Sequence, residues 1–390
     1  MKTLSRVTKN IDGQPMFKYL DMAKELELEG KHLVHMELGD PDFATPKNII
    51  EAAYKSLNNN GTHYCSSYGL RELRETVCSN IKLSRGFTPN LDQVLITPGA
   101  NIGIFYAVYC LVDPGCEVII PDPSFSTYLS TIKMCGAKAV KVPLLEKNQF
   151  RLNPEDVEKA ITENTRLIII NSPNNPTGSV MTHNEIRKIY QIAKKYDLYL
   201  YSDEIYSRMN YDYSSIFSPS VYDECKEHVI LSDGFSKSFA MTGWRLGTLV
   251  GPPKVIERMS ALLQTTSSCV SPFIQEAGKE ALEGSQLDVY SMMEEFKERR
   301  KILVYGLNQI KGFSCVTPGG AFYVFPNITG TGLSSEEVFR GLLQAGVVSC
   351  PGNCFGEHGE GYIRLCYATS RENIKLALQR IEKWANGIRS

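Results

Sequence analysis

Short apolar runs alternate with amphipathic helical stretches from Thr45 to Gly251, and this alternation is the strongest constraint on the fold. The runs are rich in β-branched and aromatic residues and are apolar on both faces, which is typical of parallel strands covered by helices on either side. Such a series predicts a wound α/β sheet. We expect its buried strands at residues 93–97, 117–121, 166–171, 198–203 and 229–233.

Helical and strand patterns continue around and beyond this series. Thr45 as N-cap and Pro46 in the first turn predict the start of a helix. Gly86 predicts the end of the helix that begins near Leu70. A long helical region starts at about Pro253. A shorter mixture follows it, with strands expected at residues 313–316, 320–326 and 362–367 and a helix at the end.

These elements predict more than one domain. At 390 residues the chain exceeds the roughly 100–200 residues of an ordinary domain. We predict a large α/β domain with a mostly parallel sheet over residues 46–295 and a smaller α+β domain over residues 296–390. Residues 1–45 are expected to form an N-terminal arm, helical over residues 14–30, that packs with the small domain.

Composition narrows the class of partner. The chain has 42 Lys and Arg against 43 Asp and Glu, so no net field attracts nucleic acid or an anionic membrane. No apolar run approaches the ~18 residues that span a bilayer, and residues 1–14 lack a signal-like apolar stretch. The 11 cysteines stand singly, without the paired spacing of zinc sites. We expect a cytoplasmic protein with reduced thiols and no metal, whose partners are small molecules.

Polar and glycine-rich segments follow the predicted strands directly, at the edge where wound sheets bind their ligands. They include Thr97–Asn101, Asn171–Gly178, Ser202–Tyr206 and Ser236–Arg245. The first joins a strand to a helix, whose free backbone N–H groups favour a phosphate. In the second, two prolines and a glycine hold Asn175 in a fixed turn, from which it can donate a hydrogen bond into a site.

Charged side chains in these segments indicate the chemistry. Asp203 ends an apolar strand and needs a partner there, such as a buried cation. Lys237 lies between a strand end and Arg245, which makes it a candidate for a phosphate or Schiff-base site. Arg364 interrupts an apolar strand in the C-terminal part, a position that requires an anion.

Each segment taken alone also has a structural explanation. A glycine turn like that after Thr97 is more often structural than functional, and the loop at Asn175 has the composition of a tight surface turn. Asp203 can serve as a helix N-cap, Lys237 as a solvated side chain, and Arg364 as half of a structural ion pair. The functional hypothesis therefore depends on the whole set and its order.

In this order the segments resemble those of fold-type I pyridoxal 5'-phosphate (PLP) enzymes, in particular the class I aminotransferases of the bacterial aspartate aminotransferase-like branch. The resemblance covers nearly the whole chain, from Leu38–Phe43 through Tyr64, Tyr68–Gly69 and Leu73–Glu75 to Arg364. It implies a homodimeric enzyme that moves an amino group from an L-amino acid to a 2-oxo acid by a ping-pong mechanism.

The resemblance also implies roles for cofactor-binding and catalytic residues. Lys237 matches the lysine that carries PLP as a Schiff base and shuttles the proton, and Asp203 the carboxylate that keeps the pyridine nitrogen protonated. Tyr206 and Asn175 match the pair that hydrogen-bonds the phenolic oxygen, and Phe125 the aromatic that stacks on the ring. The implied phosphate site comprises Gly99, Ala100, Ser236 and Arg245, and Asn101 is a further implied cofactor-binding residue.

Further matches concern the substrate and the partner subunit. Arg364 matches the arginine that grips the substrate α-carboxylate, with Asn175 and Gly39 against the same group. Tyr64 matches a tyrosine that the neighbouring subunit supplies to the cofactor phosphate. The resemblance therefore implies sites at the interface of a homodimer.

Three positions depart from the family pattern. Gly234 replaces a serine of the phosphate site, so one hydrogen bond is missing or comes from Ser236. Asn101 stands where thermophilic aspartate-specific relatives carry a lysine for the distal carboxylate, and Met16 and Phe17 occupy a stretch that is more polar in those relatives. We therefore expect an uncharged, apolar or aromatic substrate side chain. A cation from the partner subunit is the alternative, and it would restore a dicarboxylate substrate.

Other functions stay open at the sequence level. The same site runs elimination and synthase chemistry in other PLP enzymes, so a PLP-dependent lyase or synthase is the main alternative. A transcriptional regulator needs an added helix–turn–helix, and only about 45 residues precede the predicted sheet. A dehydrogenase would place G-x-G-x-x-G after its first strand, where this chain has Thr97–Asn101.

Overall fold

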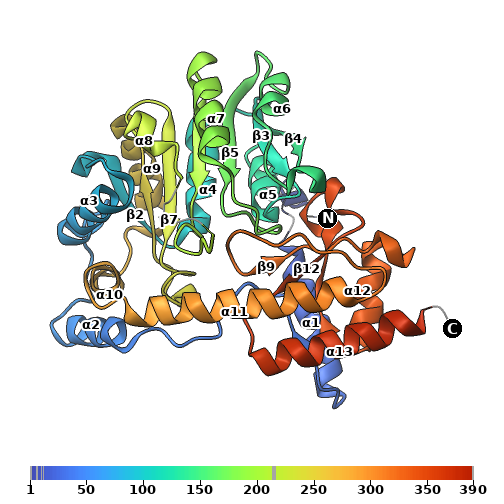
Figure 1. Ribbon diagram of the computed structural model, residues 1–390. Coiled ribbons are helices and arrows are strands. Elements are labelled where there is room, and N and C mark those ends of the chain that lie inside the picture. The colour runs from blue at the N-terminus through green and yellow to red at the C-terminus, as the bar shows by residue number, and fades with distance from the viewer. Residues whose placement is uncertain (1, 6–7, 10, 12, 213–216, 389–390) are drawn as a thin grey trace.

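A seven-stranded sheet forms the centre of the molecule, in the order β2-β8-β7-β6-β5-β3-β4 (Figure 1). The computed structural model describes residues 2–5, 8–9, 11, 13–212 and 217–388. Neighbouring strands are parallel except at β8, which is antiparallel to β2 and β7. The strands are β2 (Val94–Thr97), β3 (Glu117–Asp122), β4 (Lys138–Pro143), β5 (Thr165–Asn171), β6 (Tyr199–Asp203), β7 (Val229–Gly234) and β8 (Gly247–Val250).

Alternation along the strands explains why helices cover both faces of the sheet. In β5, Ile168 and Ile170 belong to one apolar cluster and Leu167 and Ile169 to another, because successive side chains point to opposite faces. The predicted wound, mostly parallel sheet is confirmed. One face packs against α3 (Arg71–Arg85), α6 (Pro154–Lys159), α7 (His183–Lys195) and α10 (Pro272–Glu283), and the other against α4 (Ala100–Leu111), α5 (Ser126–Met134) and α9 (Pro253–Ser267).

The predicted strands of the sheet are present, but the sequence pattern does not predict β4 and β8. β4 is an edge strand that is mostly only part-buried, so it lacks a continuous apolar run. β8 has only four residues. The prediction that Thr45 caps a helix is wrong: α2 (Lys47–Asn58) begins after Pro46, and the Thr45 hydroxyl instead donates to the carbonyl of Ala240 at 2.6 Å. Gly86 ends α3 in the left-handed conformation, as predicted.

The C-terminal part is built around the long helix α11 (Leu287–Gln309), which runs below the sheet in Figure 1. The strands predicted at 320–326 and 362–367 are present as shorter strands, but the strand predicted over 313–316 is wrong, because only Ser314 forms an isolated bridge. The expected boundary after residue 295 falls inside α11, and the division into domains stays a prediction. The other elements are β9 (Tyr323–Val324), β11 (Cys350–Pro351), β12 (Ile363–Cys366), α12 (Ser335–Gln344) and α13 (Arg371–Gly387).

The N-terminal segment packs against this C-terminal part. Its helix α1 (Pro15–Leu28) places the ring of Tyr19 4.4 Å from that of Phe339 in α12. Its strand β1 (Val34–His35) pairs in parallel with β10 (Val347–Val348). α1 thus lies beside the C-terminal elements although it is far from them in sequence (Figure 1).

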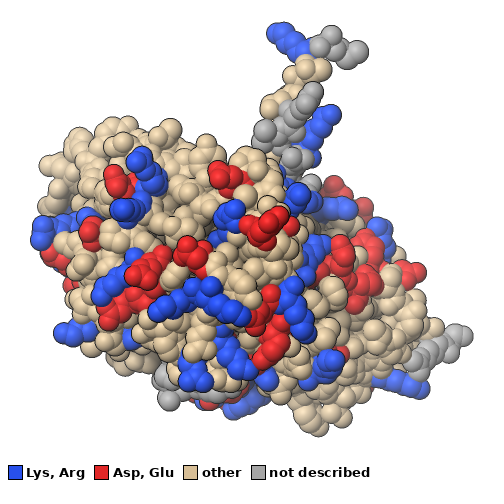
Figure 2. Space-filling view, turned by 90° about the horizontal axis from the view of Figure 1, so that it is seen from above, with Lys and Arg blue, Asp and Glu red and all other residues tan. Residues whose placement is uncertain are grey.

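Charges are mixed on the surface. Figure 2 shows basic and acidic side chains interspersed over the face seen from above, as the balanced composition leads one to expect. Among the described residues, no helix is long and apolar enough to cross a membrane.

Candidate active site

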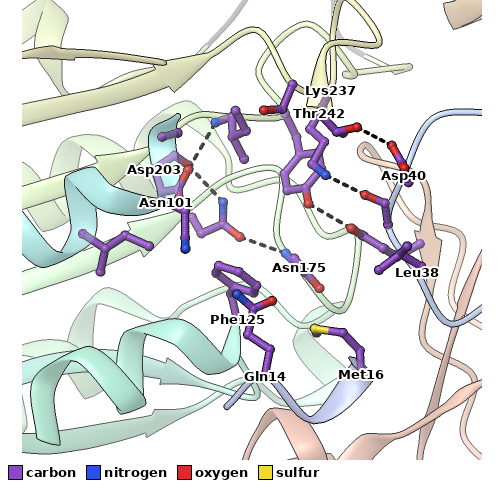
Figure 3. Close-up of a pocket in the computed structure, with 18 of the residues that line it drawn as sticks. Gln14, Met16, Leu38, Asp40, Asn101, Phe125, Asn175, Asp203, Lys237 and Thr242 are labelled. Atoms are coloured by element: carbon purple, nitrogen blue, oxygen red, sulfur yellow. Dashed lines mark hydrogen bonds between the residues drawn. The ribbon is translucent and has the colours of Figure 1, made fainter. Parts of the chain in front are cut away.

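The carboxyl edge of the large sheet borders a cavity with a volume of about 470 Å³ (Figure 3). Segments that follow β2, β3, β5, β6 and β7 line it, together with β12, the segment after β1 and the start of α1. The structure therefore brings together most of the residues predicted for the site. These are Gly39, Ala100, Asn101, Phe125, Asn175, Asp203, Tyr206, Ser236, Lys237, Arg245 and Arg364.

Lys237 lies in a loop that leaves and rejoins the same edge of the sheet, because Gly234 at the end of β7 pairs with Gly247 at the start of β8. Its Nζ donates a hydrogen bond to the carbonyl oxygen of Gly39 at 2.5 Å. Burial lowers the pKa of the Lys237 ammonium to about 8. An appreciable fraction of the amine is therefore neutral near pH 8, and the neutral amine is the nucleophilic form.

Asp203 ends β6 and is 6% exposed. One carboxylate oxygen accepts a hydrogen bond from the hydroxyl of Tyr128 at 2.6 Å, and the other from the backbone N–H of Ile205 at 3.3 Å. Burial raises the pKa of Asp203 to about 6. No cation among the described residues forms an ion pair with it, whereas the adjacent Glu204 pairs with Arg85 at 2.7 Å. Asp203 is thus a buried carboxylate that can still accept a cationic partner.

The loop after β5 is a buried turn and not a surface turn. Asn171 accepts from the backbone N–H of Asn175 at 2.8 Å and donates to the carbonyl oxygen of Asp203 at 3.0 Å. The side-chain oxygen of Asn175 accepts from Arg364 Nη1 at 2.9 Å, and Asn175 lines the cavity. The hydroxyl of Tyr206 also lines the cavity and lies 2.9 Å from that of Tyr323.

Arg364 lies on β12 and is 1% exposed. Besides Asn175, it donates to the carbonyl oxygen of Glu37, and its guanidinium lies over the rings of Tyr323 and Phe355 at 4.6 and 4.7 Å. Its Nε has no hydrogen-bond partner, and no carboxylate among the described residues forms an ion pair with it. The structural ion pair considered from sequence is therefore absent, and the guanidinium can bind an anion.

The start of α4 and Arg245 form the polar end of the cavity. Gly99 precedes the helix with φ of 85°, and a Cβ atom there would lie 2.5 Å from Arg245 Nη2, so glycine is required for this close approach. Arg245 Nη1 donates to the carbonyl oxygen of Thr242 at 2.7 Å. A helix N-terminus beside a guanidinium suits a phosphate group.

Two residues differ from expectation. Tyr64 does not line the cavity of this chain and is 87% exposed. Tyr128, the hydrogen-bond donor to Asp203, is absent from the sequence prediction. It follows Phe125 by one helical turn, and the two rings meet edge to face with centroids 5.8 Å apart. This helical spacing from a predicted cofactor-stacking residue is the signal that points to Tyr128.

Comparisons with known proteins define the family. A family model described as aminotransferase class I and II matches residues 31–381. Aspartate aminotransferase of Pyrococcus horikoshii is 44% identical over 358 residues, 91% of each chain. Aromatic-amino-acid aminotransferase 2 of Thermococcus litoralis is 40% identical over 370 residues, 94% of each chain. The structure of aspartate aminotransferase from Thermus thermophilus with maleate superposes with a TM-score of 0.95 at 34% identity, covering 98% of this chain and 100% of that one.

The fold and the site define a fold-type I PLP enzyme. More narrowly, the chain belongs to the class I and II aminotransferases, and the lyase or synthase alternative is not favoured. The described residues fit PLP: Lys237 has a lowered pKa, Asp203 is a buried carboxylate without a cation, and Arg245 lies beside a helix N-terminus. No group of three or more metal-binding side chains occurs in the described part of the chain.

Proposed function

We propose that the cavity at the carboxyl edge is the transamination site and that it takes an L-amino acid and a 2-oxo acid in turn. The observation that carries this proposal is the presence of a lysine, a buried carboxylate and a buried arginine around one cavity. They are Lys237, Asp203 and Arg364, each from a different element. When bound, PLP supplies a sink for the electrons released at the substrate α-carbon.

Four side chains are proposed to hold and tune the cofactor ring. Asp203 would keep a proton on the pyridine nitrogen, because no cation among the described residues pairs with this buried carboxylate. Asn175 and Tyr206 donate to the phenolic oxygen and stabilise its negative charge. Phe125, which lines the same cavity, would stack on the pyridine ring.

The phosphate is held at the opposite end of the cavity. The backbone N–H groups of Ala100 and Asn101 at the start of α4, the hydroxyl of Ser236 and the guanidinium of Arg245 supply the donors. Gly99 keeps the backbone close to this guanidinium. Ser236 thereby serves in place of the serine that Gly234 replaces.

Lys237 and Arg364 act on the substrate. Arg364, whose Nε has no protein partner, would donate to the α-carboxylate, with the backbone at Gly39 closing over the same group. Lys237 Nζ would hold the cofactor, and its free amine would accept and deliver the proton of the substrate α-carbon. Its lowered pKa suits both tasks near neutral pH.

The substrate side chain is proposed to be uncharged, apolar or aromatic. The cations that line the cavity are Lys237, Arg245 and Arg364, and each has a role already. The space beyond them is bordered by Asn101, Met16, Phe17 and Tyr323, which offer no charge to a distal carboxylate. Leaving such a carboxylate unpaired in a buried site costs at least ~2 kcal/mol.

The enzyme is further proposed to be a homodimer in the cytoplasm. Tyr64 follows α2, whose exposed apolar side chains Ile50, Tyr54 and Leu57 provide a surface that a second subunit can cover. From that position Tyr64 would reach the partner's cofactor phosphate. All 11 cysteines are described and free, which agrees with a reducing compartment.

Borohydride reduction of the purified enzyme, followed by peptide mapping, tests the central assignment. The expected result is a single reduced cofactor adduct on Lys237, with neither adduct nor turnover in Lys237→Ala. An adduct on another lysine contradicts the site. Release of ammonia from an amino acid without any 2-oxo acid acceptor would instead indicate lyase chemistry.

A further inference from the structure

A buried carboxylate lies just outside the proposed site. Glu37 is 1% exposed and belongs to the segment that links β1 to the cavity. Its Oε1 lies 2.8 Å from His35 Nδ1, and its Oε2 has no hydrogen-bond partner among the described residues. Because an ionised carboxylate is costly to bury, His35 is the group that compensates its charge.

His35 lies between two carboxylates. Its Nε2 lies 3.0 Å from Glu27 Oε1 on α1, while its Nδ1 faces Glu37. Ionised carboxylates only accept hydrogen bonds, so both ring nitrogens carry protons and the imidazole is cationic. Accordingly, the hydrogen bond with Glu37 and then that with Glu27 raise the pKa of His35 to about 9, against an opposing effect of burial.

Other neighbours of His35 do not compete for this role. The paired strand β10 contributes the apolar Val347 and Val348. From α13, Arg380 binds the backbone and ring of His32, three residues before His35. The charge on His35 thus links α1 to Glu37.

The segment from Glu37 to Gly39 also contacts both cations that act on the substrate. The carbonyl oxygen of Glu37 accepts from Arg364 Nη2, and that of Gly39 accepts from Lys237 Nζ at 2.5 Å. A Cβ atom on Gly39 would lie only 1.8 Å from the hydroxyl oxygen of Tyr323, so the segment is tightly packed. A displacement of this backbone would shift the acceptors of Arg364 and Lys237 together.

We propose that His35 is a positioning residue, which as a cation between Glu27 and Glu37 fixes the backbone of residues 37–39 against Arg364 and Lys237. The proposal rests on the proposed function, in which Arg364 binds the substrate carboxylate. When His35 is neutral or absent, the buried carboxylate of Glu37 loses the cation that compensates its charge and is displaced. That displacement moves the carbonyl oxygen that holds Arg364, so carboxylate binding weakens.

The test measures the affinity of the holoenzyme for 3-phenylpropionate, a carboxylate that lacks the reacting amine. The ligand is titrated at a series of pH values between about 6.5 and 10, and binding is followed by the change in cofactor absorbance. In the wild type, affinity is expected to fall about tenfold as the pH rises through 9, where His35 loses its proton. His35→Gln is expected to bind about tenfold more weakly at neutral pH and to lack that step. His32→Gln, an exposed histidine at the start of the same segment, is the matched control and should follow the wild type.

A double variant separates positioning from mere loss of stability. In His35→Gln/Glu37→Gln the buried charge of Glu37 is removed together with its partner, so neutral-pH affinity should return to within about threefold of the wild type, again without the step near pH 9. Melting temperatures of all variants are recorded alongside. If His35→Gln binds within twofold of the wild type with the same pH profile, or if the double variant binds no better than His35→Gln, the positioning role is wrong. If the wild type itself fails to bind 3-phenylpropionate, Arg364 does not bind the substrate carboxylate, and both that assignment and the positioning role of His35 are wrong.

Discussion

The hydrogen bond from Tyr128 to Asp203 allows the role of Asp203 to be measured without removing its charge. Tyr128→Phe keeps the ring that packs against Phe125 and deletes only the hydroxyl, which lies 2.6 Å from a carboxylate oxygen. Both side chains are buried, so water does not replace the bond. A hydrogen bond to a charged group contributes roughly 1.5–3 kcal/mol.

The sign of the effect follows from the pKa of Asp203. Burial raises this pKa to about 6, and the bond from Tyr128 opposes that rise. Without the bond the pKa of Asp203 rises further, so at pH 7 more of the apo-enzyme carries a protonated carboxyl that cannot pair with the pyridinium. The PLP dissociation constant of Tyr128→Phe should therefore be about 2- to 15-fold higher at pH 7, because a rise in the pKa of Asp203 equivalent to these free energies lowers its ionised fraction at pH 7 by that factor. The deficit should shrink as the pH is raised toward 9.

The assay is a fluorescence titration of apo-enzyme with PLP at a series of pH values. Tyr106→Phe is the matched control, because Tyr106 is equally buried but its hydroxyl faces Thr266 and not Asp203. A Tyr128→Phe enzyme with wild-type affinity at pH 7, or with a deficit that does not depend on pH, would refute the reasoning.

Other perturbations give equally direct results. If the side-chain pocket is apolar, kcat/KM for aspartate will be less than about tenfold above kcat/KM for phenylalanine, leucine and methionine. A tenfold ratio corresponds to roughly 1.4 kcal/mol in transition-state binding. A larger ratio in favour of aspartate contradicts the role of Asn101. Mixing Tyr64→Ala with Lys237→Ala under subunit exchange should restore activity, because each hybrid dimer then holds one intact site. If hybrid dimers form but stay inactive, Tyr64 does not contribute to the site of the partner subunit. Gly39→Ala places a Cβ atom 1.8 Å from the hydroxyl oxygen of Tyr323 and should raise KM more than it lowers kcat, and Tyr323→Phe in the same chain should recover part of the loss. A KM unchanged in Gly39→Ala means that this contact does not shape the site.

Local sequence patterns account for much of the sheet and for the convergence of the site. Parallel strands buried on both faces have continuous apolar runs, so β5 and β6 are visible in the sequence, and their polar ends must meet at one edge. β4 is not visible in this way because, as an edge strand, it carries Lys138 and Lys141 within its run.

Contacts between distant segments are the part that the sequence pattern does not contain. Tyr128 and Asp203 are 75 residues apart in the sequence, and the residues around either position do not indicate that the two are in contact. His35 and Glu37 stand two residues apart, as polar side chains on one face of an ordinary strand do. That Glu37 is buried and not solvated depends on how α1 and β12 close around it, which only tertiary packing decides.

The pairing of Gly234 with Gly247 has a consequence for how the enzyme tolerates changes in length. Surface loops usually accept insertions at little cost, because closing a longer loop costs only slightly more entropy. The loop between these glycines differs, because it carries Lys237 and Arg245 and both of its ends are fixed to adjacent strands. An added or deleted residue within it would change the separation between the two cations, which are the proposed attachment points for the reactive carbon and the phosphate of one cofactor molecule. Side chains that face away from the cavity in this loop should accept substitution, whereas its length should be fixed.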